Sequence, residues 1–423
     1  MFIFRIDKRK LEIILAAVNL LFFRGFTMTH RIYFDNSATT PVRKEVVDEI
    51  MPFLTELGGN PSSRHYEGRV VRTAVEAARA KVAAAINADP AEIYFNSCAS
   101  EGNNTVLRGY MLGLGKNAKK NHIITTAVEH PSIFNTAAAL EKEGFEVTYL
   151  PVDEKGNLDL DDLRKAIKEN TGLISTMFVN NEIGNIYPVE EIGKIAREHN
   201  ILFHVDAVQA VGKIPVDVKK IGCDFLTVSA HKFYGLKGVG ALFVKRGRVL
   251  KNLLTGGHQE HGKRPGTENV VGIIGMGKAI ELAVAELDGE AKRVAALRDH
   301  LEQRILSEIP YTRVVGDPSH RVPTLSNISF RFVEGEGILL KLDTEGIAVS
   351  TGSACSSSDL KASHVIMAMH GDPEEAHSSI RFSLGKHSTL EDVDYTVDTL
   401  KSTISLLRSF SPIYDEFVNA DKH

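Results

Sequence analysis

An acid and a lysine follow two apolar runs that resemble neighbouring buried strands. Asp206 follows the run 201–203, and Lys232 follows the run 225–228. At the ends of adjacent strands, a carboxylate and an amine can hold opposite ends of one flat heterocycle. Pyridoxal phosphate (PLP) has this requirement, because a lysine forms a Schiff base with its aldehyde and a carboxylate keeps its ring nitrogen protonated. The pair therefore predicts an enzyme that acts on an amino acid.

The stretch after Lys232 favours this interpretation over that of a lone surface lysine. Residues 235–240 read GLKGVG, and their glycines allow the chain to return tightly beside a bulky ligand. The stretch does not match GxGxxG, and it lacks the strand before and helix after that a dinucleotide-binding loop needs. We therefore exclude a dinucleotide site here.

Several other polar residues lie where predicted strands end. Ala99 and Ser100 lie between a strand and a helix, where backbone N–H groups bind phosphate well. His130 follows the run 123–126, and Asn181 follows another apolar run. Each of these residues is also common in an ordinary turn. Arg381 lies in an alternating strand pattern, where it is structural or grips a carboxylate through two hydrogen bonds.

The three cysteines are scattered, without disulfide or zinc-type spacing. Cys355 lies in residues 350–359, a small, polar, glycine-containing stretch that predicts a loop. An accessible thiol in a loop suggests chemistry, because the exposed thiolate is the reactive form. Cys98 and Cys223 adjoin apolar runs, so we expect core or near-core positions for them. A reducing compartment, the cytoplasm, fits this cysteine usage.

The composition is that of an ordinary globular protein of 423 residues, with 43% hydrophobic and 25% charged residues. A net charge of −4 and the lack of a dense basic run argue against a nucleic-acid surface. The apolar stretch 11–23 is short and interrupted, so no membrane span is expected. Residues 1–28 form an extension of unclear role: an upstream start-site addition, a packing helix or a targeting segment.

Strand-like and helix-like runs alternate between residues 70 and 245. This pattern predicts an α/β fold, with a mainly parallel sheet covered by helices and ligands gathered beyond the carboxyl ends of its strands. A helix is expected to begin near Asn104, and a long one to cover 271–307. The pattern after residue 310 predicts a smaller α+β domain. We place a segment that packs with that domain at 29–45, the large domain at 46–290 and the small domain at 291–423.

Taken together, the chain resembles a cysteine desulfurase of the NifS/IscS type, within the class-V aminotransferase family of fold-type I PLP enzymes. The resemblance runs from Ile32 to about Arg408. It rests on short motifs that are specific in combination: residues 33–40, 59–63, 180–184, 204–209, 229–232, 264–267 and 350–356.

The resemblance implies a role for each candidate residue. Lys232 bonds to PLP and then moves protons, Asp206 pairs with the ring nitrogen, Gln209 contacts the ring hydroxyl and His130 stacks on the ring and assists proton transfer. The phosphate is held by Ala99, Ser100, Ser229 and His231, joined by Thr267 from the partner of a homodimer. Asn36, Asn181 and Arg381 bind substrate, and Asn181 also contacts PLP. Cys355 takes the sulfur of L-cysteine as a persulfide, releases alanine and passes the sulfur to an acceptor such as an iron–sulfur scaffold.

Other functions remain open from the sequence. An aminotransferase would use the same scaffold but needs no thiol, and activity as a selenocysteine lyase stays an alternative. A non-catalytic sulfur-relay or scaffold protein is disfavoured, because the reacting groups are present. The chain departs from the family pattern at Ser100, Leu236, His258 and Pro265, and its tail after residue 409 is shorter than the tail with which relatives dock a scaffold.

Overall fold

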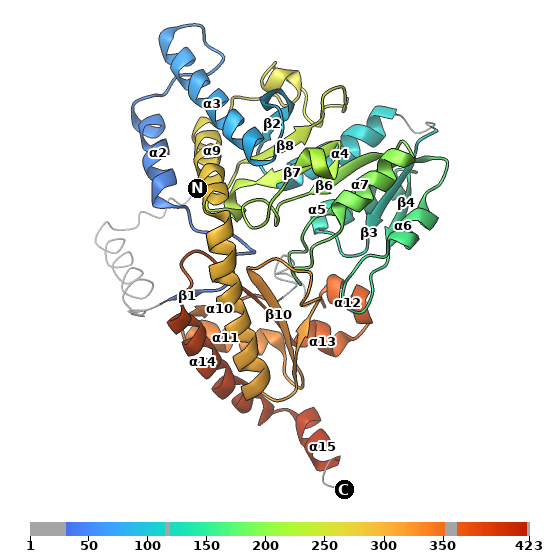
Figure 1. Ribbon diagram of the computed structural model, residues 1–423, viewed down its shortest axis with the longest axis vertical. Helices are drawn as coiled ribbons and strands as arrows, with labels where there is room; N and C mark the ends of the chain where they lie inside the picture. Colours follow the sequence, from blue (N-terminus) through green and yellow to red (C-terminus); the bar gives the residue numbers. More distant parts are fainter. Residues whose placement is uncertain (1–30, 115–118, 352–361, 421–423) are drawn as a thin grey trace, which may run out of the picture.

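The computed structural model describes residues 31–114, 119–351 and 362–420 (Figure 1). Its larger part is built round a seven-stranded sheet of order β2-β8-β7-β6-β5-β3-β4. The strands are β2 (Ile93–Asn96), β3 (His122–Thr126), β4 (Glu146–Leu150), β5 (Thr171–Met177), β6 (Leu202–Asp206), β7 (Phe225–Ser229) and β8 (Gly240–Val244). Strand β8 alone runs opposite to the other six, since it pairs antiparallel with both β7 and β2. The predicted mainly parallel sheet is confirmed.

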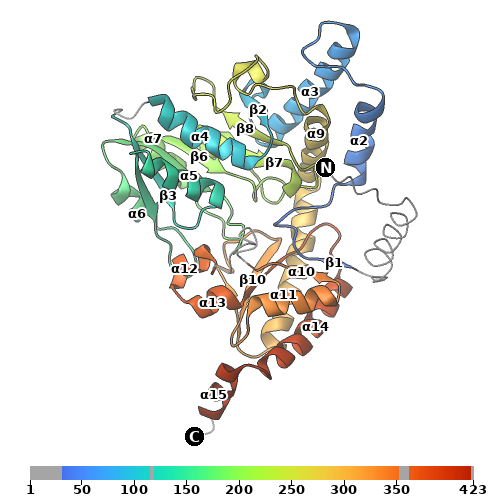
Figure 2. The same ribbon diagram turned by 180° about the vertical axis from the view of Figure 1, so that it is seen from behind.

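Helices cover both faces of this sheet. Helices α4 (Ala99–Leu114) and α5 (Pro131–Lys142) lie on one face, seen at the front in Figure 2, and α7 (Val189–Glu198) lies on the other (Figure 1). Consecutive strand residues face opposite sides of the sheet. Ile123 packs in the cluster that includes residues of α4 and α5, and Ile124 in the cluster that includes residues of α7. Because both faces are buried, the strands are apolar runs rather than alternating ones.

The helices that flank the large sheet at one end are α2 (Lys44–Thr55), α3 (Tyr66–Ala85) and α9 (Val270–Ala285), and α3 packs along α9. Short elements complete this part of the chain: η1 (Pro90–Glu92), α6 (Leu160–Ala166), α8 (Val218–Ile221), η2 (Ala230–Lys232) and η3 (Glu260–Gly262).

A second, smaller sheet lies below the first in Figure 1. It is antiparallel, in the order β12 (Ser379–Ser383), β10 (Leu325–Phe330) and β9 (Thr312–Val315). Near it, β1 (Ile32–Tyr33) pairs in parallel with β11 (Ile347–Ala348). The helices of this part are α10 (Leu287–Glu308), α11 (Gly335–Thr344), α12 (His364–His370), α13 (Pro373–Ser378), α14 (Leu390–Arg408) and α15 (Pro412–Ala420).

One buried cluster joins the start of the described chain to this smaller part. Phe34 packs in the same cluster as Leu301, Ile328 and Phe382. The α+β character predicted for the C-terminal region is confirmed by the three-stranded antiparallel sheet and its helices.

Two helix boundaries differ from expectation. The helix predicted to begin near Asn104 begins at Ala99, because the Glu101 carboxylate accepts hydrogen bonds from the backbone N–H and the hydroxyl of Ser97 and so caps its first turn. The long helix predicted over 271–307 is two helices, α9 and α10, which meet at Glu286. The Glu286 carboxylate pairs with Arg43 and Lys386 at this junction.

No helix within the described ranges combines the length and apolar character that a membrane span requires.

Candidate active site

A cavity of about 290 Å³ opens beyond the carboxyl ends of β6 and β7, where ligands gather in open parallel sheets. Most of the candidate residues line it, although they come from segments far apart in the chain. The lining residues are Ser37, Ala38, Cys98, Ala99, Ser100, His130, Met177, Val179, Asn181, Asp206, Val208, Gln209, Ser229, His231, Lys232 and Arg381.

Asp206 is the last residue of β6 and is 6% exposed. Its Oδ2 accepts a hydrogen bond of 2.7 Å from the Asn103 side chain, and its Oδ1 accepts one from the Val208 backbone N–H. Asn103 lies on α4, is fully buried and also donates to the Ser132 hydroxyl. The carboxylate is thus held in one orientation at the cavity wall. Asn103 was not among the predicted residues, because an asparagine inside a helix carries no local signal of such a contact.

Lys232 ends the short turn η2 that follows β7. Its ammonium donates to the backbone oxygens of Ser37 and Ala38, at 2.6 and 2.7 Å. The same turn is tied down by the His231 carbonyl oxygen, which accepts from the Thr40 N–H and hydroxyl. Residues 37–40 therefore lie against Lys232 and hold its turn in place. The two segments are almost 200 positions apart, so no local sequence pattern predicts this contact.

His130 caps the N-terminus of α5, and its Nδ1 accepts from the Ser132 backbone N–H at 3.1 Å. Burial lowers the pKa of His130, and Lys232 lowers it further, while the Asp206 carboxylate acts in the opposite direction. The imidazole at the cavity wall is therefore neutral near pH 7, with a flat face available for contact with a ring.

Arg381 lies in the middle of β12 and is 3% exposed. Its guanidinium donates to the Asn181 carbonyl oxygen at 3.0 Å and pairs with the Asp35 carboxylate at 2.8 Å. Its buried Nε has no hydrogen-bond partner within the described ranges of the chain. The small sheet thus places one guanidinium beside a cavity formed mainly by the large sheet.

The first turn of α4 forms another wall, where Ala99 and Ser100 present the N-terminal end of a long helix. Backbone N–H groups at such an end attract anions. Cys98 also lines the cavity and is partly exposed, so of the core or near-core position expected for it, the core one is wrong. It lies where the chain turns from β2 into α4, so the apolar run before it ends short of the thiol. Cys223 is buried, as expected.

Two predicted residues lie apart from this cavity, and the position of a third is not described. Thr267 is exposed and does not line it, and Asn36 lines a different cavity, with its side-chain amide donating to the Tyr33 and Ser383 carbonyl oxygens. Cys355 lies outside the described residues. Their roles stay predictions.

Two buried acids that were not predicted adjoin residues lining the cavity. Glu129, next to His130, is fully buried, and burial raises its pKa to about 8. Glu182, next to Asn181, accepts a 2.5 Å hydrogen bond from the Ser363 hydroxyl. His364 Nε2 donates a hydrogen bond of 2.9 Å to the Glu129 carbonyl oxygen, since a carbonyl oxygen only accepts. The chain after the segment 352–361 is thus fastened beside the cavity.

Comparison with known proteins identifies the family. Residues 32–396 match the model of the aminotransferase class-V family. The chain belongs to the class-V aminotransferase family. Family members are PLP-dependent enzymes.

Individual relatives are similar to this chain over most of its length. A protein of Dictyoglomus turgidum named cysteine desulfurase IscS is 52% identical over 390 residues, which cover 92% of this chain and 98% of the relative. A cysteine desulfurase IscS of Methanosarcina thermophila is 48% identical, over 92% of this chain and 95% of the relative. Among solved structures, a NifS-like protein has a TM-score of 0.84 and 39% identity, covering 89% of this chain and all of that one.

The cavity of this class-V aminotransferase fits PLP in its chemistry. An amine, a carboxylate and a helix N-terminus surround one space, and these are the partners for an aldehyde, a pyridine nitrogen and a phosphate. The Asp206 carboxylate is oriented into this space by Asn103 at 2.7 Å. Lys232, Asp206, Ser100, Ser229 and His231 would hold the cofactor.

Proposed function

We propose that the protein is a PLP-dependent cysteine desulfurase, which converts L-cysteine to L-alanine and holds the sulfur as a persulfide on Cys355. The observation that carries this proposal is the meeting of Lys232, Asp206 and Arg381 at one cavity, in a chain 52% identical to a protein named cysteine desulfurase. An amine, an acid and a guanidinium are the groups needed to bind and deprotonate an amino acid.

Each side chain has a task in this proposal. PLP, when bound, supplies an electron-withdrawing ring that stabilises negative charge at the substrate α-carbon. The Asp206 carboxylate keeps a proton on the ring nitrogen. The Lys232 amine would bond to PLP in the resting enzyme and would remove the α-proton of the substrate as a general base. Arg381 pairs with the substrate carboxylate, and its fork geometry fixes the orientation of the amino acid.

The neutral His130 imidazole, which lines the cavity, would stack on the ring of bound PLP and assist proton transfer. The N-terminal turn of α4, at Ala99 and Ser100, binds the phosphate together with Ser229 and His231. Gln209 contacts the ring hydroxyl, and Asn181 contacts both PLP and substrate. Asn36 is proposed as a further substrate contact.

The sulfur step is a displacement at the substrate sulfur in which carbon is the leaving group. The Cys355 thiolate attacks this sulfur, an S–S bond forms and the C–S bond breaks. The electron pair of the C–S bond stays on the substrate carbon, which takes a proton on the way to alanine. The persulfide then transfers its outer sulfur to an acceptor protein, such as an iron–sulfur scaffold. We also propose a homodimer, in which Thr267 completes the phosphate site of the partner subunit, and a cytoplasmic location.

The decisive experiment is an assay of the purified protein with PLP, L-cysteine and dithiothreitol. We expect sulfide and alanine in equal amounts, and neither product from Lys232→Ala, which should also be colourless. Formation of a keto acid without sulfide would instead support an aminotransferase. A strong preference for selenocysteine over cysteine would support a selenocysteine lyase.

A further inference from the structure

Lys213 lies behind the cavity and takes no part in the reaction proposed above. The chain turns back on itself after β6, with the Val211 N–H bonded to the Ala207 oxygen and the Lys213 N–H bonded to the Ala210 oxygen, both at 3.0 Å. This turn brings the Lys213 ammonium onto the side-chain oxygen of Gln209, to which it donates a hydrogen bond.

This contact fixes which way the Gln209 amide faces. The charged ammonium only donates and the Ser37 carbonyl oxygen only accepts, so the amide oxygen faces Lys213 and the amide nitrogen faces Ser37. The amide nitrogen therefore lies on the other side, where it donates to the Ser37 backbone oxygen at 2.9 Å. An amide nitrogen carries two hydrogens, and Gln209 lines the cavity. Its second N–H is thus available to an acceptor in the cavity.

An ammonium at this position is energetically unfavourable, which suggests a role for Lys213. Lys213 is only partly exposed, and burial is the main reason that its pKa falls to about 7, followed by repulsion from Lys232 and Arg381. Lys213 in turn contributes to the low pKa of His231. Within the described residues it forms no ion pair with a carboxylate, and its hydrogen bond goes to a neutral amide. Such a cluster of cations is unfavourable until an anionic ligand arrives.

We propose that Lys213 is a positioning residue for the cofactor: it locks the Gln209 amide so that its nitrogen faces the cavity and donates to the ring oxygen of PLP. The proposal rests on the assignment of PLP to this cavity. Lys213 acts through Gln209 and touches neither substrate nor reacting atoms. Without the ammonium, only the bond to the Ser37 oxygen holds the Gln209 amide in this orientation. The flipped amide, which would present its oxygen to the anionic ring oxygen and repel it, then becomes easier to reach.

The test is a double-mutant cycle on PLP affinity. Holoproteins carrying Lys213→Met, Gln209→Leu or both are dialysed against graded PLP concentrations. Bound PLP is then measured by absorbance after release in alkali. We expect Lys213→Met to raise the dissociation constant roughly tenfold, the loss of one hydrogen bond to a charged group, and to shift the visible absorption band of bound PLP. In the Gln209→Leu background the same substitution should change neither quantity.

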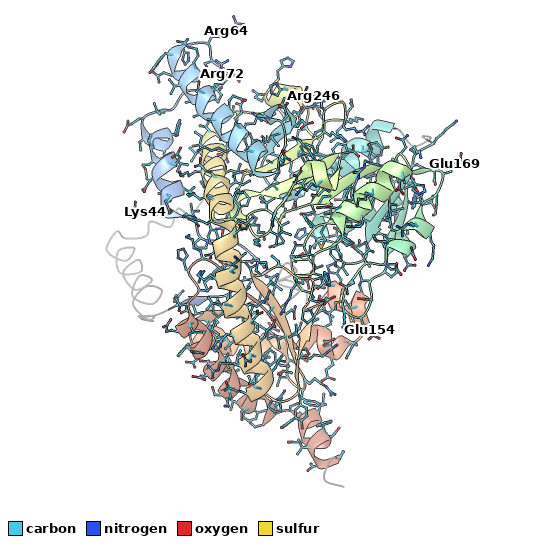
Figure 3. The ribbon with its side chains drawn as sticks, in the orientation of Figure 1. Lys44, Arg64, Arg72, Glu154, Glu169 and Arg246 are labelled. Carbon is cyan, nitrogen blue, oxygen red and sulfur yellow. The ribbon has the colours of Figure 1, made fainter. Side chains whose placement is uncertain are left out.

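The matched control is Lys44→Met, on the outer surface of α2 (Figure 3), which should bind PLP as the unmodified protein does. Lys213→Gln, which keeps a donor, should lose less affinity than Lys213→Met and replaces it in the cycle if that variant does not fold. Unchanged PLP affinity in Lys213→Met, or equal effects with and without Gln209, would overturn the inference. A protein that binds PLP but makes no sulfide would overturn the proposed function and leave this inference intact.

Discussion

Ser350 and Arg381 exchange two backbone hydrogen bonds: the Arg381 N–H donates to the Ser350 oxygen at 2.7 Å, and the Ser350 N–H donates to the Arg381 oxygen at 3.2 Å. Arg381 is the residue proposed to bind the substrate carboxylate, and Ser350 stands just before the segment that contains Cys355. The chain that leads to the proposed nucleophile is therefore attached to the residue that positions the substrate.

Arg381→Lys should weaken substrate binding more than it slows turnover. Lysine keeps the charge but loses the fork that grips a carboxylate through two hydrogen bonds. We expect the KM for L-cysteine to rise roughly tenfold or more, with bound PLP unchanged. Steady-state kinetics of sulfide release measures both parameters. An unchanged KM would remove Arg381 from the substrate site.

Cys355→Ala should keep bound PLP and remain yellow, yet release no sulfide from L-cysteine, because no thiol takes the sulfur. The control is Cys223→Ala. Cys223 is buried, and burial raises the pKa of its thiol far above the usual range, so it supplies no thiolate. Sulfide release at the rate of the unmodified protein by Cys355→Ala would refute the assignment of the nucleophile.

Glu129→Gln should flatten the pH dependence of stability. Burial raises the pKa of Glu129 from 4.5 to about 8. Below pH 4.5 the carboxyl is protonated in both the folded and the unfolded chain. Between these values the unfolded chain ionises while the folded chain holds its proton, so stability falls as pH rises. Urea unfolding at pH 5 and pH 8 should show a smaller loss for Glu129→Gln; parallel losses would contradict this account.

Glu260→Ala should destabilise the fold strongly. Glu260 and Arg79 form a bidentate ion pair, each with a side chain 4% exposed, and Glu260 also accepts from the Phe95 N–H at 2.7 Å. Removing the acid leaves the buried guanidinium with only the exposed Glu76 carboxylate as a charged partner, at a cost of about 3–5 kcal/mol in the free energy of unfolding.

The same arginine offers a matched control. Glu76, whose side chain is 53% exposed, also pairs with Arg79, and Glu76→Ala should cost less than about 1 kcal/mol. Chemical denaturation of both variants compares the two partners directly. Equal losses would mean that burial does not determine the strength of these pairs.

The parts of the site that sequence could predict follow from the sheet. Buried parallel strands are apolar runs, and their carboxyl ends share one edge, so Asp206 and Lys232 were expected to meet. The contacts that orient them were not predictable. Asn103 reaches Asp206 from inside a helix, and the Ser37 and Ala38 oxygens reach Lys232 from the start of the chain. Such contacts depend on the packing of distant segments, for which one sequence carries no periodic signal.

The reversed direction of β8 has a consequence for Lys232. A parallel neighbour would require a long crossover after β7, whereas an antiparallel one is reached by a short connection. In this connection the Ala230 N–H donates to the Val239 oxygen, and Gly238 adopts a left-handed conformation with φ +77°. The backbone that carries the Lys232 amine is therefore fixed by β7 before it and by β8 after it. It loses its conformational entropy during folding, so little more is lost when the amine binds its ligand.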